Sequence, residues 1–209
     1  MAARNLVRRY PVTFFVGLTY FLSWVAWAPI VGGSDLPTEL FIIIGGFGPL
    51  VAAGTLTWIL GDSVREWAMQ VLRWRVPLRY WIVAFFLPAL SVIGVSSLHI
   101  LVLGGEFDPE PVSTLLLYPV VFLQVFFIGG GNEELGWRGF ALPRLQEQFS
   151  AFVASLIIGV VWFAWHLPLF FVSGSSQAGD PLAYYAISVI ALSFVFTWVY
   201  NQTEGSVLV

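Results

Sequence analysis

The sequence predicts an all-α, polytopic membrane helix bundle, and three observations support this fold class. The chain has 209 residues, of which 58% are hydrophobic and 10% charged, whereas about a quarter of a soluble domain is charged. Apolar runs of about 20 residues, the length that crosses a bilayer core, recur along the chain. The arginines gather in alternate connections between these runs, as the positive-inside rule requires of a multi-spanning protein.

Six apolar runs predict six membrane-spanning helices in a single integral-membrane domain, residues 1–209. The connections between them are rich in Gly, Pro, Asp and Ser, which is typical of turns. Residues 206–209 resemble the start of a seventh helix, so we expect the sequence to be a fragment that ends as this helix begins. The predicted spans are residues 12–31, 40–60, 80–103, 114–131, 151–172 and 182–200.

The positions of the arginines predict the orientation of the chain in a cell membrane. All nine lie at the N-terminus, in the 61–79 connection or in the 132–149 segment, and none lies in the alternate connections. The N-terminus is therefore predicted to be cytoplasmic, on the same side as residues 132–149. For residues 61–79, an interfacial amphipathic helix and a solvated loop both remain open.

Composition also excludes several classes of function. The absence of cysteine excludes disulfides, thiolate nucleophiles and Cys-ligated zinc. A net charge of −3 with scattered arginines gives no basic patch for nucleic acid. The partner that composition does predict is the lipid bilayer.

One stretch holds three ionisable side chains in an otherwise apolar sequence: Glu133, Glu134 and Arg138. A charge at the bilayer centre costs at least about 2.5–3.5 kcal/mol, so these side chains must face a protein interior or a wet cavity. On a helix, Glu134 and Arg138 stand at i and i+4 and can pair, whereas Glu133 points about 100° away from Glu134. Glu133, desolvated and without a cation of its own, suits general-base work. The alternative is an ion-pair network that only fixes helix packing.

Two further polar residues are candidates for the same site. His166 lies inside the fifth predicted span, two residues before Pro168, where a kink would free backbone carbonyls. Asn201 brings an amide to the cytoplasmic end of the sixth span and is a possible polar support. We expect His99, near the outer end of the third span, to be a packed or interfacial residue.

These motifs together resemble the CAAX protease and bacteriocin-processing (CPBP or Abi) family, which includes the type II CAAX prenyl endopeptidases. The resemblance rests on Glu133-Glu134-x-x-x-Arg138, Trp162-x-x-x-His166 and a span ending in Tyr200-Asn201, and extends over most of residues 40–205. Trp162 stands where the family usually has Phe. A later family motif, with a His and an Asn, has no counterpart in these 209 residues.

The resemblance implies an intramembrane endopeptidase that cleaves a protein or peptide, of the CAAX-type prenylated or leader-peptide class, with Glu-activated water. It implies catalytic roles for Glu133, Glu134, Arg138 and His166, on helices at about 114–148, 151–172 and 182–201. It also suggests a metalloprotease, with His166 and Glu133 as candidate ligands of a divalent metal such as zinc. A zinc site needs three protein ligands, so a metal-free mechanism remains equally open.

Alternative functions remain open, and the predicted positions of Glu133 and His166 along their helices do not match. The chain could be a non-enzymatic immunity or scaffold protein of the same fold, or a proton-coupled transporter. At 1.5 Å per residue, His166 lies roughly 22 Å along its span while Glu133 is near a helix end, so the two meet only if helix four continues toward Leu142 or helix five begins near Gln146. Because His166 is then the sole remaining donor, we expect the 209-residue fragment alone to be inactive.

Overall fold

The structure is a computed structural model that describes residues 2–104 and 116–209, and within these ranges it contains helices and turns but no strand. The predicted all-α membrane bundle is confirmed. Four helical segments are long and apolar enough to cross a membrane. They are α2 (Pro11–Val31), α3 with α4 (Thr38–Gly46 and Gly48–Leu60), α11 with the 3-10 turn η4 (Ala151–Trp165 and Leu167–Phe171) and α12 (Leu182–Gln202).

The other two predicted spans are represented by helices with shorter described apolar stretches, at residues 78–87 and 118–128. The beginning of the predicted 114–131 span lies outside the described residues. Outside these four spans, the elements that precede residue 130 are α1 (Ala2–Arg9), α5 (Val64–Ala68), the 3-10 turn η1 (Met69–Leu72), α6 (Leu78–Leu103), α8 (Tyr118–Gln124) and the π-helical turn η2 (Val125–Gly129).

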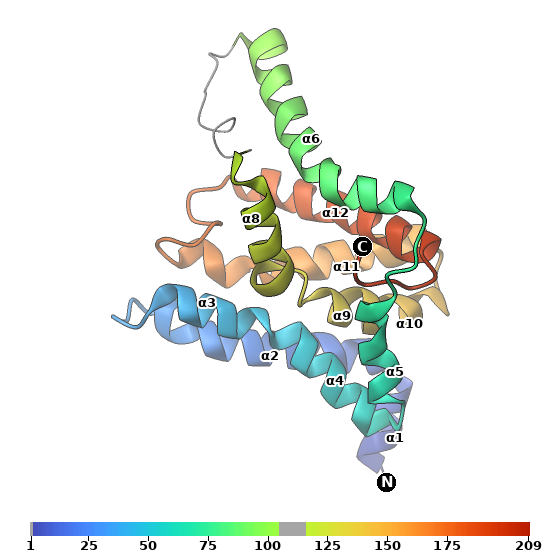
Figure 1. Cartoon of the computed structure of the whole chain (residues 1–209). Helices are drawn as coiled ribbons and strands as arrows, with labels where there is room; N and C mark the ends of the chain where they lie inside the picture. The colour runs from blue at the N-terminus through green and yellow to red at the C-terminus, as the bar shows by residue number, and fades with distance from the viewer. Residues whose placement is uncertain (1, 105–115) are drawn as a thin grey trace.

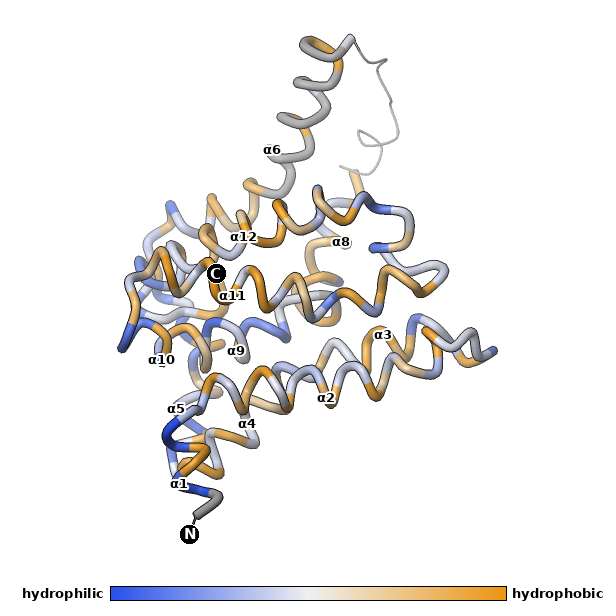
Figure 2. The backbone as a smooth tube through the Cα atoms, turned by 180° about the vertical axis from the view of Figure 1, so that it is seen from behind, coloured by the Kyte–Doolittle hydropathy of each residue, from blue (hydrophilic) through white to orange (hydrophobic). Residues whose placement is uncertain are grey.

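Two groups of helices form the two sides of the bundle. On one side α2 packs against α3 and α4, and on the other α11 packs against α12. A central segment, residues 134–146, runs between them and contacts α4 on one side and α11 and α12 on the other (Figure 1). Figure 2 shows a hydrophilic stretch at α9 among hydrophobic helices. The central segment consists of α9 (Glu134–Gly136), the π-helical turn η3 (Trp137–Ala141) and α10 (Leu142–Gln146).

Buried aromatic rings join the two sides through the central segment. Trp137 lies between Phe15 of α2 and Trp165 of α11, with ring centroids 5.2 and 6.1 Å away. Trp165 also packs on Trp27, at 4.9 Å. Such aromatic pairs each contribute about 0.5–1.5 kcal/mol beyond the area they bury. The central segment is therefore held at its middle by rings from both sides.

The second predicted span is broken at Phe47 rather than continuous. Pro49 has no N–H to donate to the carbonyl of Gly45, four residues earlier, and Ser23 Oγ donates to that oxygen instead, at 2.7 Å. A Cβ on Gly48 would lie 2.0 Å from Ser23 Oγ, so this close approach requires a glycine. The break also lets Asn132, next to Glu133, donate to the carbonyl of Gly46 at 3.1 Å.

The fifth span is interrupted where the sequence predicts. The α-helix ends at Trp165 and continues as the 3-10 turn η4, in which Leu169 N–H donates to the carbonyl of His166. The carbonyl of Trp165 receives the indole N–H of Trp24 instead, at 3.0 Å. Pro168 is the physical cause, because it has no N–H and clashes with the preceding helical turn.

Residues 203–209 do not form the predicted start of a seventh helix. The chain turns at Gly205, which has a left-handed φ of 83°, and then binds the end of η1. Val207 N–H donates to the carbonyl of Gln70 and Ser206 Oγ to that of Arg73. The backbone N–H of Val207 is therefore bound to η1 and not to a helical turn of its own segment.

Candidate active site

The central segment begins directly after Glu133, whose carboxylate lies against Trp162 of α11. It is helical from Glu134 to Gln146, whereas α11 begins at Ala151. Neither predicted arrangement is found as stated, because the fourth helix ends with η2 at Gly129 and residues 130–133 form turns. A separate helical segment then carries the chain past Leu142. Gly136 permits this path, because a Cβ there would lie 2.7 Å from the carbonyl oxygen of Pro49.

Glu134 and Arg138 form the ion pair that their spacing predicts. Arg138 Nη1 lies 2.8 Å from Glu134 Oε1, and the Arg138 side chain is only 2% exposed. Its guanidinium also lies over the rings of Trp162 and Phe196, 4.7 and 4.9 Å from their centroids. The guanidinium thus contacts one carboxylate and two aromatic faces from α11 and α12. Cation–π contacts of this kind stabilise a cation that is removed from water.

Glu133 lies next to this pair and has a different partner. Its carboxylate is buried and accepts a hydrogen bond from Trp162 Nε1, 2.8 Å from Oε2. The carbonyl of Trp162 in turn accepts from Nδ1 of His166, at 2.8 Å. Because a carbonyl can only accept, this bond places a ring proton on Nδ1, and in the neutral imidazole Nε2 then carries the lone pair. One tryptophan therefore connects the carboxylate and the imidazole.

Several buried polar atoms around this group have no hydrogen-bond partner within the described part of the chain. Each such atom costs about 1–3 kcal/mol if it stays unsatisfied. Buried polar groups in folded proteins nearly always have a partner, so this group of residues keeps unused hydrogen-bonding capacity. The atoms are Asn132 Oδ1, Trp165 Nε1 and both Nε and Nη2 of Arg138.

Comparison with known proteins shows which family this chain resembles. Residues 113–209 match the family described as Type II CAAX prenyl endopeptidase Rce1-like, and this range includes every residue of the site named so far except those from α2 and α4. The predicted resemblance is therefore confirmed. This chain is similar to the type II CAAX prenyl endopeptidases.

A curated relative shows the same similarity over a longer range. CAAX prenyl protease 2 of Methanococcus maripaludis is 31% identical over 132 residues, which cover 59% of this chain and 49% of the relative. The match thus spans about half the length of that protein.

The metal that the family resemblance suggests does not fit the residues described here. A catalytic zinc takes three protein ligands and an open position. The described ranges contain no group of three His, Cys, Asp or Glu side chains that could hold a metal ion. Glu134 is bound to Arg138, which leaves Glu133 and His166 as the candidate ligands. The chemistry proposed below uses no metal-dependent step.

Asn201 and His99, the other two polar residues that the sequence analysis discusses, are not seen among the site residues. Asn201 is exposed on α12, and the residue of that helix that faces Arg138 is Phe196. The predicted polar support from Asn201 is therefore not observed. The side chain of His99 lies outside the described residues.

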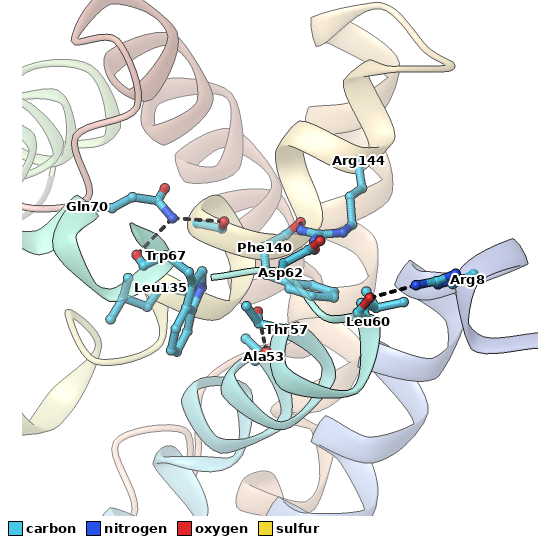
Figure 3. A network of polar contacts seen from close by, with 11 residues as sticks. Arg8, Ala53, Thr57, Leu60, Asp62, Trp67, Gln70, Leu135, Phe140 and Arg144 are labelled. Atoms are coloured by element: carbon cyan, nitrogen blue, oxygen red, sulfur yellow. Dashed lines mark hydrogen bonds and ion pairs between the residues drawn. The ribbon is translucent and has the colours of Figure 1, made fainter. Parts of the chain in front are cut away.

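The connection after α4 contributes contacts that sequence reasoning missed (Figure 3). The indole N–H of Trp67 donates to the carbonyl of Leu135 at 3.0 Å, and Gln70 Nε2 donates to that of Gly139 at 3.2 Å. At the end of the central segment, Arg144 bridges the carbonyl of Phe140 and the carboxylate of Asp62. These side chains donate to carbonyls in and beside the π-helical turn η3 and so tie the connection after α4 to the central segment.

The structure adds an inward contact that neither interpretation of residues 61–79 includes. The connection forms two short helices, α5 and η1, that turn Trp67 and Gln70 inward onto the central segment, while Trp74 stays 61% exposed. An amphipathic pattern was the available signal, but it does not say whether its apolar side meets lipid or protein.

Proposed function

We propose that this chain forms the catalytic bundle of a membrane endopeptidase that cleaves CAAX-type prenylated proteins with water activated by Glu133. One observation carries most weight: a buried carboxylate without a cation of its own is held by Trp162, whose carbonyl orients His166. The family description and the relative's name support the substrate class. The apolar helices around the site suit a substrate carried in the bilayer.

Hydrolysis needs a base, an oriented water and a donor for the developing oxyanion. Glu133 takes a proton from water while the water oxygen attacks the peptide carbonyl carbon, whose π electrons move to the carbonyl oxygen. When the tetrahedral intermediate collapses, the C–N bond breaks and Glu133 returns the proton to the leaving nitrogen. Glu133 ends the cycle unchanged, as a catalyst must.

The remaining residues take roles that follow from their partners. His166 donates through Nδ1 to Trp162, so its Nε2 can accept a hydrogen bond from the attacking water and orient it. Glu134 neutralises Arg138. This division leaves Glu133 as the one carboxylate of the pair that is not bound to a guanidinium, which keeps it available as a base.

Glu133→Gln tests the function directly. The full-length protein, purified in detergent, would be incubated with a prenylated CAAX peptide, and the products identified by mass spectrometry. We expect cleavage by the wild type and by Glu147→Gln, which changes an exposed carboxylate, and loss of turnover in Glu133→Gln at an unchanged unfolding temperature. A folded Glu133→Gln protein that retains most of its activity would refute the general-base role. A folded wild type that cleaves no peptide would favour the non-enzymatic alternative.

A further inference from the structure

Trp67, in the connection after α4, binds the central segment at the residue that follows Glu134. Its indole N–H donates to the carbonyl of Leu135 at 3.0 Å, and Figure 3 shows the ring turned toward that residue. Gly54 of α4 lies behind the same ring, because a Cβ there would be only 3.3 Å from it. The donor is therefore carried by a ring that packs against a membrane-spanning helix.

Gln70 binds the same segment four residues further on, at the residue that follows Arg138. Its Nε2 donates to the carbonyl of Gly139 at 3.2 Å and to that of Trp67 at 3.0 Å. Its Oε1 accepts from the hydroxyl of Tyr200 on α12, at 3.0 Å. Because both partners of Nε2 are carbonyls, which only accept, the amide has one possible orientation. Gln70 is 7% exposed, so these bonds form away from water.

The central segment needs such contacts because its helical pieces are short. The α-helix α9 has 3 residues, the π-helical turn η3 has 5 and α10 has 5. Isolated helices shorter than about 12–15 residues are marginal in water. The side chains that bind this segment from other elements therefore determine much of its position.

The backbone of Glu133 belongs to the first turn of the central segment. Its carbonyl accepts from the N–H of Gly136 at 2.8 Å and from that of Trp137 at 3.0 Å. In the proposed reaction, the Glu133 carboxylate must stay within hydrogen-bond reach of the attacking water and of the leaving nitrogen. A shift of the central segment would move this carboxylate relative to Trp162 and His166 on the opposite side of the site.

The connection after α4 is itself fixed at its start. Ser63 Oγ accepts from the N–H of Glu66 at 3.1 Å and so caps α5. The carboxylate of Asp62 lies 2.6 Å from Arg144 at the end of the central segment. Trp67 and Gln70 thus donate from a connection that is bound at both of its neighbours, α4 and the central segment.

We propose that Trp67 and Gln70 are positioning residues for the hydrolysis, which hold the central segment where Glu133 reaches the substrate, and that Tyr200 orients Gln70. This role rests on the proposed endopeptidase function. The three side chains act through the backbone of the central segment and not on the reacting atoms. A misplacement of about 1 Å caused far from the chemistry can cost about 10²-fold in rate. The effect of losing these bonds should therefore appear in kcat.

The test measures kcat and KM of the full-length protein on a prenylated CAAX peptide, with kcat expressed per folded molecule. Gln70→Met keeps the length of the side chain and removes its hydrogen bonds, so kcat should fall by about 10- to 10²-fold while KM stays within about twofold. Trp67→Phe removes the indole N–H and should act in the same direction. The control is Gln148→Met, which changes an exposed glutamine in the turn after α10 and should match the wild type.

Gln70→Glu separates positioning from packing through the pH dependence of kcat. A protonated carboxyl can donate its O–H to Gly139 and still accept from Tyr200, whereas a carboxylate can only accept. The kcat of Gln70→Glu relative to wild type should therefore rise as the pH is lowered from about 8 to about 5. The same ratio for Gln70→Met should not change with pH. Tyr200→Phe should lower kcat alone but add little to Gln70→Met, since both act through one hydrogen bond.

Three results, each obtained with a wild type that cleaves the peptide, would overturn the inference while leaving the proposed function intact. A folded Gln70→Met variant with kcat within about twofold of wild type would reduce Gln70 to a structural role, even if its unfolding temperature is lower. A higher KM at unchanged kcat would assign Gln70 to substrate binding. An equally low ratio for Gln70→Glu at every pH would show that the donated hydrogen bond is not what matters.

Thermal unfolding of each variant separates these outcomes from a folding defect. If Gln70→Met does not fold, the pH dependence of Gln70→Glu and the effect of Tyr200→Phe decide the question. If the wild type itself cleaves no peptide, the proposed function fails and this role fails with it.

Discussion

Arg138→Met separates the charge of the buried pair from its volume. The substitution leaves the Glu134 carboxylate without its partner at 2.8 Å and removes the guanidinium from two aromatic faces. Breaking a buried ion pair by removing one partner costs about 3–5 kcal/mol. For a chain of this size, 1 kcal/mol corresponds to about 2–4 °C, so we expect the unfolding temperature to fall by about 6–20 °C.

The double variant Glu134→Leu with Arg138→Met provides the matched comparison. Replacing both members of a buried pair by apolar residues of similar volume is often neutral or stabilising. We therefore expect the double variant to recover most of the loss. Unfolding would be followed in detergent micelles at one scan rate by tryptophan fluorescence. If Arg138→Met unfolds within about 2 °C of the wild type, or the double variant is no more stable than the single one, charge pairing does not hold this helix.

Two further predictions concern orientation and packing. Single cysteines at Ser34 and Ser173 should react with an impermeant thiol reagent on intact cells, because these connections carry no arginine and are predicted to face outward. A cysteine at Ser63 should not react. The reverse labelling pattern would show that the predicted topology is inverted. Gly136→Ala should destabilise the protein by about 1–3 kcal/mol, because its Cβ would meet the Pro49 backbone at 2.7 Å, whereas Gly46→Ala has no neighbour within 4 Å and should be neutral. Equal unfolding temperatures for the two alanine variants would contradict the close packing of α9 on α4.

The sequence by itself determined the features that depend on composition and on local spacing. A chain with 58% hydrophobic residues and regular apolar runs had to form membrane helices. The four-residue spacing of Glu134 and Arg138 predicted their ion pair, since i and i+4 share a helix face. Pro168 predicted a kink in the fifth span, because proline removes a donor wherever it stands. The family motifs also lie in the sequence itself.

Only the tertiary structure decided which distant groups meet. Glu133 and Trp162 are 29 residues apart, and their contact depends on the turns at residues 130–133 and on the helical segment that follows them. Helical periodicity does not predict this break. Gln70 lies 69 residues before Gly139, to whose carbonyl it donates. Hydrogen bonds between elements depend on packing in three dimensions, and a one-dimensional pattern records the donors and acceptors but not their pairing.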